Sequence, residues 1–143
     1  MENLSSLNER FDLVVSSLAI HYVKDFEKLA SDVFDLLNEN GLFVFSQEHP
    51  FNTCFSEGNR WTKDEMGNKL FANLSNYSTD GVRESVWFID GVKKYHRTFS
   101  SIINTLVAAG FSIEKLIEPI PTEELLLEFP DQRDLYVPYK RFW

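Results

Sequence analysis

The chain has 143 residues, of which 43% are hydrophobic and 25% charged, an ordinary balance for one globular domain with a core of its own. The net charge of −8, without any block of Lys or Arg, argues against nucleic acid and anionic membranes as partners. The sequence shows no signal-peptide pattern and no apolar run of the roughly 20 residues that a membrane span needs, so we expect a cytoplasmic protein. Its lone cysteine, Cys54, excludes an internal disulfide and a multi-cysteine metal site.

The first third of the chain predicts a strand, a helix and a second strand. Residues 11–17 are short, β-branched and apolar on both faces, which is typical of a strand buried from both sides. Asp25 suits the N-cap of a helix whose apolar positions recur at helical spacing over 26–37, and Asn40-Gly41 is expected to end it. Residues 42–46 form a second, fully apolar strand. The crossover is long enough to make the two strands parallel.

The middle of the chain, residues 50–95, is rich in Asn, Gly, Ser and aromatic residues and predicts an inserted lid. Within it, the runs 86–89 and 92–95 flank Asp90-Gly91. Asp-Gly between two such runs favours a tight β-hairpin turn. We therefore expect a hairpin that lies outside the main sheet.

Regular α/β patterning resumes after this region. Thr98 suits the N-cap of a helix whose apolar positions run to Val107, and Gly110 is expected to end that helix. Residues 112–117 predict a strand, and residues 123–128 predict a short helix. The fold class is therefore α/β.

Several of these stretches, in this order, resemble the class I S-adenosylmethionine (SAM) dependent methyltransferases of small-molecule type, within the broad methyltransferase-domain family. The stretches are residues 11–22, residues 36–46, Glu48-His49-Pro50, and residues 94–98 leading into 106–111 and Glu118-Pro119. The resemblance implies a partial Rossmann-like methyltransferase sheet, the region of strands 4 to 7, with an inserted β-hairpin lid. It also implies SAM as the cofactor and a small molecule as the methyl acceptor.

The sequence departs from the family at its beginning. A complete member starts with a strand and a glycine-rich turn that approaches the cofactor, whereas the six glycines here form no Gly-x-Gly and only ten mostly polar residues precede Phe11. We therefore expect residues 1–10 to be a polar tail and 11–143 a partial methyltransferase domain, with 50–95 as its lid. Such a C-terminal portion should be inactive or weak alone.

The resemblance also assigns candidate site residues, because ligands of open α/β sheets lie beyond the carboxyl ends of the strands. It places the methionine part of SAM along Ser16, Ser17 and Leu18. The histidines are candidates for a general base or a substrate-orienting group: His21, His49 and His96. Candidates for the acceptor pocket are Tyr22, Trp61, Trp87, Tyr95 and Arg97.

Each of these residues also has a structural interpretation. His21-Tyr22 suits a cap that packs under the helix, and Glu48-His49-Pro50 suits the exit of a strand, because a residue before proline is held extended. His96-Arg97 suits a helix start at which Arg97 pairs with an acidic neighbour. The wide spacing of the three histidines argues against a metal site.

Without the family's first strand, the strand 11–17 becomes an edge with open amides. We expect a homodimer or a separate partner chain to cover this edge. The alternative function is accordingly a non-catalytic dimerising or partner-binding module derived from a methyltransferase fold.

Overall fold

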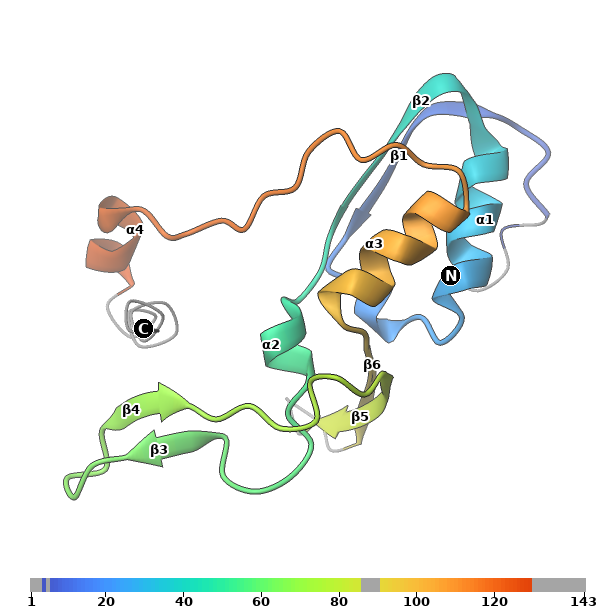
Figure 1. Ribbon diagram of the computed structural model, residues 1–143. Coiled ribbons are helices and arrows are strands. Elements are labelled where there is room, and N and C mark those ends of the chain that lie inside the picture. Colours follow the sequence, from blue (N-terminus) through green and yellow to red (C-terminus); the bar gives the residue numbers. More distant parts are fainter. Residues whose placement is uncertain (1–3, 5, 86–90, 130–143) are drawn as a thin grey trace. The chain divides into compact units, whose positions relative to one another are not determined.

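A pair of parallel strands forms the sheet of the larger structural unit (Figure 1). The computed structural model describes residues 4, 6–85 and 91–129. Contacts divide the chain into a first unit, residues 1–56 with 75–113, and a second unit, residues 57–74 with 114–143. The predicted insertion over 50–95 therefore contributes to both units, and its role as a lid stays a prediction.

The first unit opens with the predicted strand, helix and strand. Strand β1 (Phe11–Ser17) leads into the short 3-10 helix η1 (Ile20–Tyr22), then α1 (Phe26–Leu36) and strand β2 (Leu37–Ser46). The strands are parallel, with Leu13 opposite Leu42 and Ser17 opposite Ser46, which confirms the predicted crossover (Figure 1). Both strands therefore end at the same edge of the sheet.

Helix α1 begins where the sequence predicts and ends earlier. The Asp25 carboxylate accepts a hydrogen bond from the Lys28 amide at 2.9 Å, the expected N-cap. The prediction that Asn40-Gly41 ends the helix is wrong, because Leu37 is already extended and pairs with Phe11. Asn and Gly are weak helix formers, so pairing with β1 provides the better set of backbone hydrogen bonds for this stretch.

The core lies between the sheet and two helices, α1 and α3 (Phe99–Ala108). Val14 of β1 and Phe43 and Phe45 of β2 pack against the buried side chains of the helices and of the segment after β1, which are Ile20, Val23, Phe26, Leu29, Ala30, Val33, Leu37, Ile102 and Leu106. This burial is the main driving force for the first unit, since each fully buried Val, Leu, Ile or Phe side chain contributes about 1.5–3 kcal/mol.

The prediction that the first strand is buried from both sides is wrong for the described part of the chain, and the second strand is likewise covered on one face only. The side chains that alternate with the core positions are Leu13, Val15, Leu42 and Val44, and they are 52–63% exposed. The reason is that α1 and α3 cover the same face of the sheet. Among the described residues β1 pairs with β2 alone, so β1 is an edge, as predicted.

The predicted hairpin is present with a different register. Strand β5 (Gly81–Ser85) pairs antiparallel with β6 (Val92–His96), and Ser85 lies opposite Val92. A two-residue turn at Asp90-Gly91 would place Ile89 opposite Val92, so the predicted register is wrong; the predicted first arm, 86–89, falls outside the described residues. Arg83 explains the observed register, because its guanidinium donates to the carbonyl oxygens of Cys54 and Thr79 and thereby fixes β5.

Helix α3 has both predicted ends. The Thr98 hydroxyl accepts a hydrogen bond from the Ser101 amide at 3.0 Å. After the helix, Gly110 adopts a φ of +106°, and a Cβ there would lie 2.8 Å from the ring of Phe34. Glycine is therefore required at this position both for its backbone conformation and for the space that the phenyl ring occupies.

Residues 111–122 form neither helix nor strand, so the predicted strand 112–117 is wrong. An apolar segment becomes a strand when a neighbouring strand satisfies its amides and carbonyls. The three sheets of the described residues each contain two strands, and none of them includes this segment.

The second unit contains a small hairpin and a short helix. Strand β3 (Trp61–Lys63) pairs antiparallel with β4 (Lys69–Ala72), and α4 (Glu123–Glu128) confirms the predicted helix. The Thr122 hydroxyl caps α4 by accepting from the Leu125 amide. No side chain of α4 is buried.

His96 joins three segments of the first unit. Its Nδ1 lies 2.8 Å from the hydroxyl of Thr53 in helix α2 (Pro50–Thr53), and its Nε2 donates to the carbonyl oxygen of Tyr77 at 2.8 Å. The residue is only 1% exposed. Burial lowers the pKa of His96, the bond to Tyr77 and the charge of Asp80 oppose this effect, and the charges of Arg83 and Arg97 add to it.

Because Thr98 caps a helix of the core, Thr98→Ala should lower the free energy of unfolding by about 1 kcal/mol. The matched control is Thr122→Ala, which removes the same kind of cap from α4, a helix without buried side chains. Urea unfolding followed by circular dichroism should show the loss for Thr98→Ala alone. Equal losses in both variants would contradict the role of α3 in the core.

Because the pKa of His96 is lower in the folded than in the unfolded chain, acid should destabilise the fold. The stability from the neutral imidazole is complete above the unfolded pKa of about 6.5 and is lost as the pH falls from there toward the lowered folded value. His96→Gln keeps one donor and one acceptor and should show a smaller stability difference between pH 7.5 and 5.5 in urea unfolding. If His96→Gln and the unmodified chain show the same stability difference between pH 7.5 and 5.5, His96 is not a source of the acid sensitivity.

Candidate functional site

Serine hydroxyls gather where β1 and β2 end. Ser17 Oγ and Ser46 Oγ are 3.4 Å apart, and the Leu18 amide lies 3.0 Å from the carbonyl oxygen and 3.1 Å from the hydroxyl of Ser46. Leu18 adopts a left-handed φ of 48°, which turns the chain sharply out of the sheet. Within the described part of the chain, the buried Ser16 hydroxyl has no hydrogen-bond partner. We call these carboxyl ends, with the residues that directly follow them, the rim.

Three charged or titratable side chains meet at the rim from three different elements. His21 comes from η1 after β1, Glu48 follows β2, and Lys94 lies on β6. Glu48 Oε1 lies 3.8 Å from His21 Nε2 and 2.5 Å from Lys94 Nζ. The Glu48 amide also donates to His21 Nδ1 at 3.4 Å. We call these three residues the rim cluster.

Burial favours the neutral form of His21. Burial lowers the pKa of His21, the carboxylate of Glu48 opposes this effect, and the ammonium of Lys94 adds to it. Since Nδ1 accepts the Glu48 amide, the neutral ring carries its proton on Nε2, facing the Glu48 carboxylate. The His21 side chain is 4% exposed and that of Glu48 29%, so Glu48 is the more accessible of the two.

Tyr22 borders the rim cluster. Its ring centroid lies 4.3 Å from that of His21, and the Lys94 ammonium lies 6.0 Å from the centre of the tyrosine ring. The side chain remains partly open to solvent. The structure thus brings together two of the residues predicted from the sequence, His21 and Tyr22.

His49 starts helix α2. Its Nδ1 accepts a hydrogen bond from the Phe51 amide at 3.1 Å, and Pro50 occupies the first turn of the helix. The imidazole also contacts the rings of Phe51 and Phe99, at centroid distances of 4.7 and 5.9 Å. These contacts favour the interpretation that His49 shapes the exit of β2, and the two bonds of His96 likewise favour a structural role. The catalytic assignment of both histidines stays a prediction.

Arg97 ties the strand β6 to the loop before α1. Its guanidinium donates to the carbonyl oxygens of Val23 at 2.6 Å and Lys24 at 2.9 Å, and lies 5.1 Å from the centre of the Phe26 ring. Burial lowers the pKa of Arg97, although nearby carboxylates oppose the effect. The hydrogen bonds thus run to backbone carbonyls rather than to the acidic side chain that the structural interpretation anticipated.

No contact with the rim cluster is described for the other predicted pocket residues. Tyr95 is half-buried on β6, opposite Val82. Trp61 belongs to the second unit, where the Lys69 ammonium lies 4.9 Å from its ring. Trp87 lies outside the described residues. In the described ranges, no group of three His, Cys, Asp or Glu side chains is arranged to hold a metal ion.

Sequence reasoning missed two members of the rim cluster as site residues, Glu48 and Lys94. Glu48 carried a signal, since it opens the Glu-His-Pro stretch directly after a predicted strand. Lys94 carried none, because a lysine on a polar hairpin is indistinguishable in sequence from a solvated surface residue.

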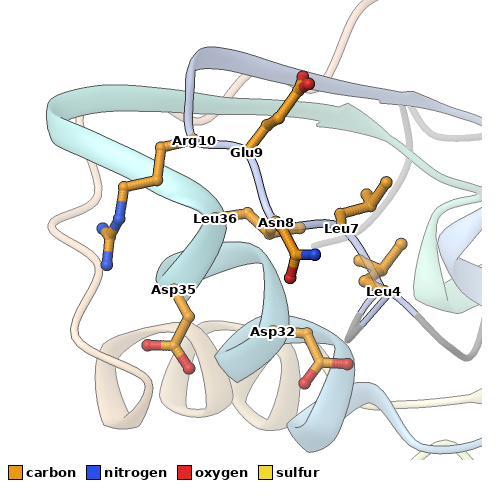
Figure 2. Close-up of a pocket in the computed structure, with 8 residues that line it drawn as sticks. All are labelled: Leu4, Leu7, Asn8, Glu9, Arg10, Asp32, Asp35 and Leu36. Atoms are coloured by element: carbon orange, nitrogen blue, oxygen red, sulfur yellow. The ribbon is translucent and has the colours of Figure 1, made fainter.

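A cavity of about 280 Å³ lies elsewhere in the first unit, between the segment before β1 and the C-terminal half of α1 (Figure 2). Its lining residues are Leu4, Leu7, Asn8, Glu9, Arg10, Asp32, Asp35 and Leu36. This position is at the amino ends of the strands, opposite to the rim. Because open α/β sheets bind ligands at the carboxyl ends, we do not assign the cavity to the candidate site.

Comparison with known proteins identifies relatives of both the sequence and the fold. The methyltransferase domain family profile matches residues 1–45. An uncharacterised protein of Haemophilus influenzae is 41% identical over 125 residues, which are 87% of this chain and 49% of the relative. No helix of the described residues has the length and apolar character required to cross a membrane.

Two crystal structures are similar in fold. A SAM-dependent methyltransferase from Mesorhizobium loti has a TM-score of 0.76 and 36% identity, over 90% of this chain and 59% of that protein. A putative SAM-dependent methyltransferase from Listeria monocytogenes has a TM-score of 0.77 and 37% identity, over 93% and 58%. The chain thus spans about half the length of the curated relative. In the part of the fold that it spans, the chain resembles the class I SAM-dependent methyltransferases and has a partial Rossmann-like sheet, and this resemblance implies SAM as the cofactor.

Proposed function

We propose that this chain takes part in methyl transfer from SAM to a small molecule, and that the rim is where this chain contributes to the reaction. The observation that carries the proposal is the position of the rim cluster beside Ser16, Ser17 and Leu18, at the carboxyl ends of two parallel strands. In an open α/β sheet, this is the place where a ligand meets side chains from several elements. A cytoplasmic location agrees with the composition of the chain.

The strand ends suit the methionine part of SAM. Ser17 and Ser46 present hydroxyls there, and the buried Ser16 hydroxyl, which has no partner among the described residues, is a polar group that a ligand or water would satisfy. When bound, SAM supplies an electrophilic methyl group.

The residues of this chain would bind and orient the acceptor. We propose that Tyr22 and Tyr95 border the acceptor, and the pocket roles of Trp61 and Trp87 stay predictions from the sequence. His21 is neutral near pH 7, the state that a general base requires. When an oxygen or nitrogen acceptor is methylated, it loses a proton. We propose that His21 of the rim cluster receives this proton.

The similarity to the two methyltransferase structures supports this proposal. The chain covers only 59% and 58% of those two proteins, which bears on what it does alone. Because the chain spans 49% of the curated relative, we propose that on its own it binds SAM weakly and is inactive or nearly so. A second chain, or a second copy, would complete the cofactor pocket.

Calorimetry with SAM and S-adenosylhomocysteine tests this proposal on the purified chain. We expect weak binding that saturates only at millimolar ligand, and Ser17→Val should abolish it because a strand-end hydroxyl is lost. Ser31→Val, which replaces an exposed serine of α1, is the matched control and should bind like the unmodified chain. Micromolar affinity would refute weak binding by the chain alone. Absence of heat at millimolar ligand would refute the assignment of the strand ends to the cofactor.

A second candidate function rests on the uncovered side of the sheet. Leu13, Val15, Leu42 and Val44 form a contiguous apolar face, and β1 has an open edge in the described part of the chain. Exposed apolar faces and strand edges favour association. We propose a homodimer through this side of the sheet, which would suit a non-catalytic, partner-binding module as well as a completed enzyme.

Light scattering tests the dimer. The unmodified chain should have twice the mass of a monomer at micromolar concentration, and Val15→Glu should shift it to a monomer because a buried, unpaired carboxylate is costly at an apolar interface. Val107→Glu makes the same change at an exposed position of α3, on the opposite side of the sheet, and should leave the mass unchanged. A monomeric unmodified chain would refute the homodimer.

A further inference from the structure

Glu48 is the only member of the rim cluster in contact with both of the others. Its Oε1 lies 2.5 Å from Lys94 Nζ and 3.8 Å from His21 Nε2, and its amide donates to His21 Nδ1. One residue thus faces both nitrogens of the imidazole. The orientation of the His21 ring therefore depends on Glu48.

The charges of the cluster act on His21 in opposite senses. The groups that face the imidazole are the carboxylate of Glu48, the ammonium of Lys94 and the phenol ring of Tyr22. A carboxylate stabilises an imidazolium, whereas an ammonium destabilises it. Because the His21 and Lys94 side chains are 4% and 14% exposed, solvent screens these effects less than at an open surface.

Lys94 connects the cluster to the hairpin β5–β6. It lies opposite Arg83 in the hairpin, and three residues further along the chain Arg97 fastens the end of β6 to the carbonyls before α1. The Arg97 hydrogen bonds thus hold β6 in the position from which Lys94 contacts Glu48.

We propose that Glu48 is a positioning residue for His21, and that the opposed charges of Glu48 and Lys94 together set the protonation of His21. The role of His21 in methyl transfer rests on the proposed function. The coupling of the Glu48 and Lys94 charges to the protonation of His21 does not. The ammonium of Lys94 offsets the carboxylate of Glu48, so that the buried imidazole stays neutral and able to take up a proton.

Proton NMR titration of the three histidines in the full chain tests this coupling without SAM or an acceptor. Glu48→Gln removes the carboxylate and should shift the titration midpoint of His21 to lower pH. Lys94→Met keeps the aliphatic stem, removes the ammonium and should shift the midpoint to higher pH. Glu39→Gln, at an exposed position of β2, is the matched control and should leave the midpoint unchanged.

Opposite shifts are the decisive result, because a merely structural contribution of Glu48 and Lys94 would not produce them. Shifts in the same direction, or none, would overturn the proposal. If Glu48→Gln does not fold, Glu48→Asp withdraws the carboxylate from both partners and should also shift the midpoint to lower pH. Opposite shifts without any SAM binding in the calorimetric experiment would keep the coupling and reject the strand-end cofactor site.

Discussion

The parallel pairing of β1 with β2 is the constraint on which the rest of the first unit depends. It brings Ser17 opposite Ser46, so that the residues following each strand, His21 on one side and Glu48 on the other, leave the sheet at the same edge. A parallel pair requires a long crossover, and α1 provides it while burying its apolar side against the sheet. Packing and site geometry therefore have one origin.

The same arrangement leaves the sheet covered from one side. Both α1 and α3 pack on the face that carries Val14, Phe43 and Phe45, so the alternate positions of the two strands remain exposed in the described part of the chain. A continuous apolar run in a strand is typical of a sheet that is buried on both faces. This pattern links the open edge of β1 to the proposed association with a second copy or a partner chain.

Burial and charge act together at the two buried histidines. For both His21 and His96, loss of solvent is the largest effect on the imidazole and lowers its pKa. They differ in their partners. A hydroxyl and a backbone carbonyl contact His96, whereas the carboxylate of Glu48 faces His21 and is itself paired with the ammonium of Lys94. Fixed neutral partners suit a structural role, and a balanced ion pair suits a group whose protonation is to be controlled.

Sequence by itself determined the elements whose signals are local: the caps at Asp25 and Thr98, the glycine at 110, and the order strand, helix, strand that carries the family resemblance. Tertiary structure decided whatever depends on a distant partner. Residues 37–41 became strand because β1 pairs with Leu37, and residues 112–117 did not because no described strand lies beside them.

The hairpin register follows Arg83 and its carbonyl partners rather than Asp90-Gly91. Likewise, the meeting of His21, Glu48 and Lys94 joins residues up to 73 positions apart, a contact that only the folded chain creates.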